Sequence, residues 1–274
     1  MLMTKDILAE FADLIREDKC NSFSGPLKTG VDLGTANIVI AVTDEDNRPI
    51  AGATADSKVV KDGIVVDFVG AMQEVRRLKA HLEERLGVPL DTAATAVPPG
   101  IIEGNVRCIA NVVEGAGFEV VNVVDEPTAA AAVLGITDGA VVDVGGGTTG
   151  ISILKDGNVI FTADEPTGGT HMTLVLAGYY GISIEAAEEL KKDKSKEQDV
   201  FPIIKPVVQK MAAIVKAFLR NYETDRVYVV GGACCFDDFE YTFEKELGIT
   251  TVKTNDSLLV TPLGIAWNAA IDPA

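Results

Sequence analysis

Two aspartates stand where a carboxylate can hold a metal ion beside a bound phosphate. Asp32 and Asp143 each close an apolar run, and a turn rich in glycine and threonine follows each of them. Such a turn aims several backbone N–H groups into one concavity, and glycine lets the backbone approach a phosphate oxygen closely. A carboxylate repels a phosphate directly but can hold Mg²⁺ through water. The pair therefore predicts a metal–polyphosphate site, although either aspartate alone would serve equally as a turn cap.

The segments around these aspartates repeat within the chain. Residues 31–42 and residues 142–154 each read as an apolar strand ending in Asp, a Gly/Thr turn and a second apolar strand. Polar turns follow both copies, at residues 44–47 and 155–158. A duplicated hairpin indicates two related lobes, and we expect them to face each other across the site.

Residues 145–150 also satisfy the Gly-x-Gly-x-x-Gly pattern of dinucleotide-binding folds. In those folds the glycines open a helix whose N-terminus meets a pyrophosphate. Here residues 151–154 alternate like a strand, and Asp143 would oppose a pyrophosphate. The sequence contains no Gly-Lys-Ser or Gly-Lys-Thr, which excludes a P-loop.

Three other segments carry residues suited to such a site. Asp125 and Glu126 stand at the start of an alanine-rich helix, and Pro127 suits its first turn. Residues 227–232 read as a buried strand ending in two glycines, where a flat ring can lie against the backbone. Residues 259–266 begin a second helix of small residues, which would allow close packing between the lobes.

The elements that must position these residues alternate along the chain. Periodicity and turn residues predict helices over residues 72–86, 106–115, 127–134, 184–192, 206–222 and 262–270. They predict strands over residues 95–97, 120–124 and 226–230. This alternation indicates an α/β fold.

An amphipathic helix is predicted at the N-terminus, over residues 1–19. Its apolar stripe has helical spacing and consists of Ile7, Leu8, Phe11, Leu14 and Ile15. A loop over residues 21–26 separates it from the first strand. Two interpretations stay open: the helix docks on its own domain, or it binds in a groove of a partner protein.

The charge balance excludes several function classes. Lys and Arg number 24 against 41 Asp and Glu, and the net charge of −17 repels nucleic acid and anionic membranes. We expect no signal peptide and no transmembrane segment. The four cysteines lack metal-site spacing and are predicted to be reduced thiols in a cytoplasm, and two histidines argue against a histidine metal site.

The order of these motifs resembles the five-part signature of actin, Hsp70 and sugar kinases. The parts are the first hairpin, Glu-Pro-Thr-Ala-Ala-Ala, Asp-Val-Gly-Gly-Gly-Thr, Val-Gly-Gly and Pro-Leu-Gly-Ile-Ala. Residues 32–37 and 61–63 are similar to bacterial actin homologues. Over nearly all of its 274 residues the chain resembles the ethanolamine utilization protein EutJ family, and the match is carried by residues 125–130, 142–151, 163–165 and 261–263.

This resemblance implies an α/β, two-lobed actin-like ATPase fold, which is a duplicated ribonuclease H-like architecture, with the N-terminal helix added. We accordingly expect lobe I over residues 28–138, closed by a helix within residues 260–274, and lobe II over residues 139–259. ATP or ADP with Mg²⁺ is the implied cofactor.

The resemblance also implies roles for individual residues around the phosphates. Backbone groups of two turns would hold the β-phosphate and the γ-phosphate, the first at Gly34, Thr35, Ala36 and Asn37 and the second at Gly145, Gly146, Gly147 and Thr148. Asp32 and Asp143 would bind Mg²⁺ through water. Glu126 would orient the attacking water, so that Glu126 and Asp143 are the implied catalytic residues. Phosphoryl transfer by this arrangement is mostly positioning and charge stabilisation.

The nucleoside end has its own implied residues. Gly231 and Gly232 would face adenine, while Glu188 and Lys191 would reach the ribose, as in similar Ala-Glu-x-x-Lys helices.

Several departures from the pattern bear on turnover. No acidic residue follows the paired glycines in residues 168–171, residue 150 is Gly, and Cys234 and Cys235 replace a small polar stretch. Hsp70's catalytic lysine has no counterpart beyond the weak candidate Lys61. The sequence therefore predicts nucleotide binding and leaves ATP hydrolysis, at most a weak activity, open. His171 is expected in a loop or at a lobe contact.

The resemblance implies an ATP-dependent chaperone-like or assembly factor in ethanolamine utilization. It would serve ethanolamine ammonia-lyase or a shell component of the bacterial microcompartment, in the cytoplasm, with lobe closure as the switch. The alternative is a bacterial-actin-type filament or a non-hydrolysing scaffold, and the oligomeric state stays open. A small-molecule kinase is less consistent with the sequence, since the insertions leave little room for a substrate pocket.

Overall fold

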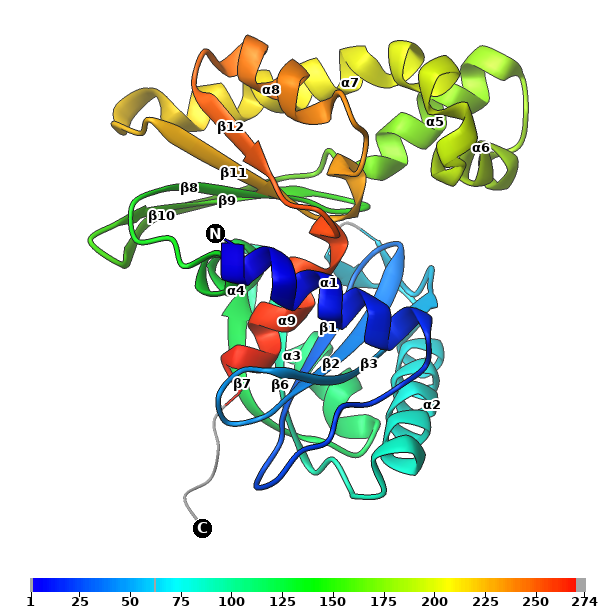
Figure 1. Ribbon diagram of the computed structural model, residues 1–274. Coiled ribbons are helices and arrows are strands. Elements are labelled where there is room, and N and C mark those ends of the chain that lie inside the picture. Colours follow the sequence, from blue (N-terminus) through cyan, green and yellow to red (C-terminus); the bar gives the residue numbers. More distant parts are fainter. Residues whose placement is uncertain (1, 62, 270–274) are drawn as a thin grey trace.

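The computed structural model describes residues 2–61 and 63–269, and residues 2–5 as backbone alone. It contains two five-stranded mixed sheets (Figure 1). The first has the order β3-β2-β1-β6-β7, with β1 (Lys28–Leu33), β2 (Asn37–Thr43), β3 (Pro49–Asp56), β6 (Thr92–Val97) and β7 (Glu119–Asp125). The second has the order β10-β9-β8-β11-β12, with β8 (Gly139–Val144), β9 (Thr149–Lys155), β10 (Asn158–Glu165), β11 (Arg226–Val230) and β12 (Thr250–Lys253). We call the first sheet with its helices lobe I and the second lobe II.

The two sheets share one topology, which explains the sequence repeat. In each, a central strand pairs antiparallel with the next strand of the chain and parallel with a later strand. Asp32 is the penultimate residue of β1 and lies opposite Val39, and Asp143 is the penultimate residue of β8 and lies opposite Gly150. The predicted duplication of the hairpin is therefore confirmed in three dimensions.

Two helices of small residues lie between the sheets, namely α4 (Glu126–Leu134) and α9 (Val260–Trp267) (Figure 1). They approach so closely that a Cβ on Gly264 would lie 2.0 Å from the carbonyl oxygen of Ala129. A Cβ on Gly30 of β1 would lie 2.3 Å from the backbone nitrogen of Ala266. The predicted close packing at the lobe junction is confirmed.

The other helices pack on the two sheets or on one another. Lobe I carries α2 (Phe68–Leu86) and α3 (Glu103–Gly115), which bury apolar stripes against its sheet. Lobe II carries α5 (Gly169–Tyr180), α6 (Ile184–Lys192), α7 (Glu197–Phe218) and α8 (Phe239–Leu247). A two-stranded hairpin, β4 (Val60–Lys61) and β5 (Ile64–Val65), extends lobe I. No helix in the described part of the chain is long and apolar enough to cross a membrane.

The N-terminal helix α1 (Leu2–Arg16) docks on lobe I. Leu8 and Phe11 are fully buried, and Leu14 is nearly so. A Cβ on Gly52 of β3 would lie 2.5 Å from the Phe11 ring, so glycine lets the helix approach the strand. Of the two interpretations of this helix, the structure shows docking on its own domain; Met1 lies outside the described residues.

The structure corrects several predicted elements. Helix α7 begins at Glu197, nine residues before the predicted start at 206, and it contains Pro202 and Pro206 because its buried apolar face outweighs the two lost backbone bonds. Helices α5 and α8 were not predicted. His171 lies in the first turn of α5 rather than in a loop. The closing helix ends at Trp267, and residues 62 and 270–274 lie outside the described residues.

Candidate functional site

A cavity of about 470 Å³ opens between the two lobes. Its walls contain every site residue proposed from the sequence, which are Asp32, Gly34, Thr35, Ala36, Asn37, Glu126, Asp143, Gly145, Gly146, Gly147, Thr148, Glu188, Lys191, Gly231 and Gly232. These residues come from segments separated by up to about 200 positions, so the fold rather than local sequence brings them together.

The two hairpin turns meet at the cavity floor. A Cβ on Gly146 would lie 3.2 Å from Thr35 and Ala36 of the other lobe. Within lobe II, a Cβ on Gly168 would lie 2.7 Å from the carbonyl oxygen of Gly145. A side chain at Gly146 would crowd the turn of the other lobe, and a side chain at Gly168 would meet the backbone of the turn in its own lobe. The arrangement places two backbone turns on opposite sides of one space, which suits a polyphosphate.

Carboxylates from both lobes converge beside the turns. Burial, and then the charge of Asp143, raises the pKa of Asp32 to about 7. Burial also raises the pKa of Asp143 to about 6, although a hydrogen bond from Thr261 opposes the rise. The pKa of Glu126 is raised well above its ordinary value by burial, and further by Asp143 and Asp32. The three acids repel one another, and a cation placed among them would relieve that repulsion.

The donor set fits a hydrated magnesium ion. In residues 2–61 and 63–269 no group of three or more His, Cys, Asp or Glu side chains forms a metal site by itself. Mg²⁺ in nucleotide sites keeps several waters and takes one or two carboxylates together with phosphate oxygens. Asp32 and Asp143, which come from opposite lobes and line the same cavity, would be such a pair of oxygen ligands.

Gly231 must be glycine for a structural reason that the sequence alone does not show. Its φ of +93° is unfavourable for other residues, and a Cβ there would lie 2.4 Å from Oδ1 of Asp143. The end of β11 therefore packs directly against the carboxylate of Asp143. Gly231 is held there by a hydrogen bond from its N–H to the carbonyl of Ser257.

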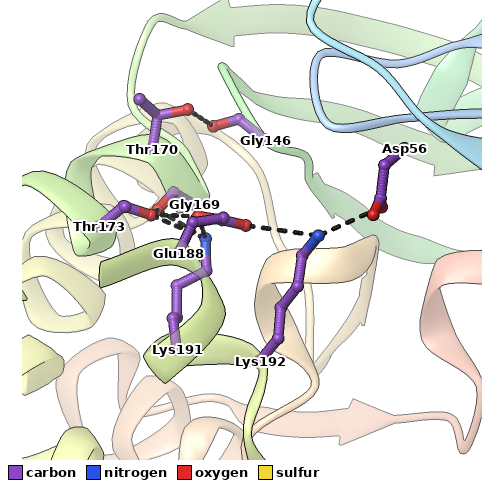
Figure 2. A network of polar contacts seen from close by, with 8 residues as sticks. All are labelled: Asp56, Gly146, Gly169, Thr170, Thr173, Glu188, Lys191 and Lys192. Carbon is purple, nitrogen blue, oxygen red and sulfur yellow. Dashed lines mark hydrogen bonds and ion pairs between the residues drawn. The ribbon is translucent and has the colours of Figure 1, made fainter. Parts of the chain in front are cut away.

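The Glu188 and Lys191 side chains form one network at the side of the cavity (Figure 2). Lys191 Nζ donates to Glu188 Oε2 at 2.7 Å, to Thr173 Oγ1 at 2.9 Å and to the carbonyl of Gly169 at 3.2 Å. Burial lowers the pKa of Lys191. Burial acts to raise the pKa of Glu188, but Lys191 and Thr173 outweigh it, and that pKa is lowered. Glu188 is thus held in its charged form by the hydrogen bonds and charge that Lys191 and Thr173 supply.

Comparison with known proteins identifies the family. The ethanolamine utilization protein EutJ of Salmonella typhimurium and that of Escherichia coli are each 44% identical to this chain, over 88% of it and 85% of their own length. The chain belongs to the EutJ family. The solved EutJ structure from Carboxydothermus hydrogenoformans has 50% identity and a TM-score of 0.93, covering 97% of this chain and 98% of that one.

Wider comparisons confirm the predicted two-lobed actin-like fold. The MreB/Mbl protein model matches residues 53–193, and the type IV pilus assembly protein PilM model matches residues 129–261. The solved PilM-PilN complex has a TM-score of 0.72 at 14% identity, over 89% of this chain and 98% of that one. MreB5 of Spiroplasma citri bound to AMPPNP has a TM-score of 0.70 at 18% identity, over 88% and 95%. At these identities the likeness concerns the fold alone.

Several cavity residues of this EutJ family member escaped the sequence analysis. Thr261 at the start of α9 donates to Asp143, which assigns a task to a residue noted only as part of a helix. Lys194 Nζ donates to Glu197 at 2.6 Å and to the carbonyl of Cys235 at 2.9 Å, and all three residues line the cavity. The charged run from Lys191 to Glu197 is the available signal in the sequence, but such a run fits a solvated surface equally well.

Proposed function

We propose that this EutJ family member binds ATP and ADP with Mg²⁺ in the cavity between its lobes. The observation that carries the proposal is the convergence of two duplicated hairpins and their two aspartates on one space. MreB5 of Spiroplasma citri, which shares the fold, has been solved with AMPPNP and with ADP. The phosphates would lie between the turns at Gly34–Asn37 and Gly145–Thr148.

Each remaining site residue has a task in this proposal. Asp32 and Asp143 would hold Mg²⁺ through water, and the bound ion would offset the phosphate charge. Thr261 keeps Asp143 oriented and favours its charged form. Glu126 begins α4 at the lobe junction, where its carboxyl group would orient the attacking water if ATP is hydrolysed. Gly231 and Gly232 would face the base, and Glu188 and Lys191 would contact the ribose.

Thermal unfolding with and without nucleotide tests this binding. A ligand bound only by the folded state stabilises it by about 2.7 kcal/mol at a hundredfold excess over its Kd. We expect Mg-ADP and Mg-ATP to raise the Tm, and ADP without Mg²⁺ to raise it less. Equal unfolding temperatures with and without Mg-nucleotide would contradict the proposal.

We further propose that nucleotide-dependent lobe closure serves an ethanolamine-utilization protein, as a chaperone-like or assembly factor. The name of the family supports the pathway. The candidate clients are ethanolamine ammonia-lyase and a microcompartment shell component, in the cytoplasm. Recovery of inactivated ammonia-lyase, with this protein and each nucleotide present or absent, tests the first client. If recovery is the same with and without nucleotide, and the same with variants of the site residues, this client role is contradicted.

A filament or scaffold role is the second candidate, favoured by the match to the MreB/Mbl model. The net charge of −17 opposes self-association at low salt, since like surfaces repel. Light scattering and pelleting with Mg-ATP separate the candidates. Nucleotide-dependent polymers would support the filament role, whereas a particle of constant size would support the assembly-factor role.

A further inference from the structure

One ion pair spans the mouth of the cavity from lobe to lobe (Figure 2). Asp56 ends β3 in lobe I, and Lys192 ends α6 in lobe II. Lys192 Nζ lies 3.2 Å from Asp56 Oδ1, and both residues line the cavity. The pair therefore closes the nucleotide space on the side of the Glu188–Lys191 network.

Lys192 is linked to that network as well. Its Nζ lies 4.0 Å from Glu188 Oε1, while Glu188 Oε2 accepts from Lys191 at 2.7 Å and from Thr173. One carboxylate thus lies between two lysines. Lys192 lies nearer to Asp56, at 3.2 Å, than to Glu188, at 4.0 Å, so Glu188 interacts mainly with Lys191 and Thr173.

A second ion pair joins the same two segments, the end of β3 and helix α6, with the charges reversed and outside the cavity lining. Lys58 of lobe I lies 3.7 Å from Glu185 of lobe II, Nζ to Oε1. Lobe I therefore presents an acid and then a base, and lobe II presents their complements on α6. Because the signs alternate, the two pairs favour one register of the closed lobes.

We propose that Asp56 is a positioning residue of the nucleotide site, acting from the opposite lobe through Lys192 on Glu188. This inference rests on the proposed nucleotide binding. With Asp56 in place, the lobes are held closed over the ligand and Glu188 stays directed at the ribose side. Without it, Lys192 turns to Glu188, competes with Lys191 for that carboxylate, and the mouth opens more often.

The Asp56–Lys192 ion pair is weak because it is exposed to solvent, so the lobes can still separate to release a nucleotide. The Asp56 side chain is 77% exposed and the Lys192 side chain 41%. Exposed pairs contribute little and are screened by salt. We therefore expect each pair to change nucleotide release by about twofold to fivefold, with the difference vanishing at high ionic strength.

The test is the release rate of a fluorescent ADP analogue, N-methylanthraniloyl-ADP with Mg²⁺, chased by excess ADP in a stopped-flow instrument. Asp56→Asn breaks the first pair, and Asp56→Glu keeps its charge. Lys58→Glu breaks the second pair, and Lys58→Glu with Glu185→Lys restores it in reverse. Asp138→Asn is the matched control, because Asp138 forms an exposed ion pair with Lys155, at 3.1 Å, and neither residue lines the cavity.

We expect Asp56→Asn and Lys58→Glu to accelerate release at low salt, and Asp56→Glu, the charge swap and Asp138→Asn to stay close to the unmodified protein. A wild-type release rate for Asp56→Asn would overturn the proposal. So would equal acceleration by Asp56→Asn and Asp56→Glu, or an acceleration that persists in high salt. Failure of the unmodified protein to bind the analogue would instead reject the nucleotide function itself.

Discussion

At the scale of single residues, the candidate site depends on three acidic side chains that the fold buries, which disfavours their charged forms. Burial raises the pKa values of Asp32 and Asp143, and the charge of Asp143 raises that of Asp32 further; burial and then both aspartates raise the pKa of Glu126. Without a cation this cluster destabilises the folded state as it ionises. A site of this kind trades stability for affinity toward a metal-bound phosphate.

The pKa of Asp32 gives a prediction with a defined sign. Its ordinary value is 3.8 and its value in the folded chain is about 7. The folded chain binds this proton more tightly, so the stabilisation is complete below about pH 4 and is lost as the pH rises through about 7. Without Mg²⁺, we expect the Tm of the unmodified protein to fall relative to that of Asp32→Asn between about pH 5 and pH 8.

Scanning fluorimetry at several pH values measures this difference. Asp32→Asn also relieves the neighbouring acids, which acts in the same direction. Mg-nucleotide should restore the unmodified protein at high pH and do little for the variant. Parallel pH profiles for the two proteins would show that the Asp32 carboxyl titrates normally.

The sequence reveals some of these residues and not others. The paired aspartates and glycines could be predicted because a repeat fixes both type and spacing. Thr261, Lys192 and Asp56 could not, because their roles depend on which side chains the tertiary fold places opposite them. An isolated threonine or surface lysine carries no such information.

At the scale of elements, close backbone approach at the lobe junction is the main requirement. A Cβ on Gly264 would lie 2.0 Å from the Ala129 carbonyl oxygen, with backbone on both sides of the contact. We expect Gly264→Ala to lower the free energy of unfolding by about 1–3 kcal/mol or more, because α4 and α9 must separate. Urea unfolding measures the loss.

Gly104→Ala is the control for this substitution. Gly104 lies in α3, and a Cβ there meets nothing within 4 Å. Alanine should be neutral or stabilising by up to about 1 kcal/mol in that helix. Equal effects of the two substitutions would contradict the packing account.

The N-terminal helix carries its own prediction. Phe11 is fully buried against β3, whereas Phe68 at the start of α2 is 40% exposed. We expect Phe11→Ala to cost about 3–5 kcal/mol and Phe68→Ala less than about 1 kcal/mol. Thermal unfolding of both variants tests this. A Phe11→Ala variant as stable as the unmodified protein would favour the partner-binding interpretation of α1.

Elements with a periodic apolar face were predictable, and those without one were not. Helix α6 and strand β11 have the predicted bounds. Helix α5 carries no charged residue and is apolar on all sides, so its sequence shows no amphipathic period. The start of α7 was misplaced because two prolines usually end a helix, whereas here the buried face outweighs them.

At the scale of the whole molecule, the duplicated architecture makes the site a property of both lobes at once. Each sheet supplies one hairpin and one aspartate, and α4 and α9 form the layer between them. We propose that the division into residues 28–138 with the closing helix, and residues 139–259, describes two bodies that close on a nucleotide. The repeat predicts two facing lobes from the sequence, because each copy supplies only one hairpin and one aspartate of the site.

The most direct test of the central claim is calorimetric titration of Mg-ADP and Mg-ATP into the unmodified protein, Asp143→Asn and Asp138→Asn. The two substitutions lie near each other in sequence, but Asp143 lines the cavity and Asp138 is exposed outside it. We predict one site per chain in the unmodified protein and in Asp138→Asn, and binding at least about tenfold weaker in Asp143→Asn, as expected for losing a charged metal-side ligand. Absence of binding at millimolar nucleotide, or equal affinity in all three proteins, would contradict the account.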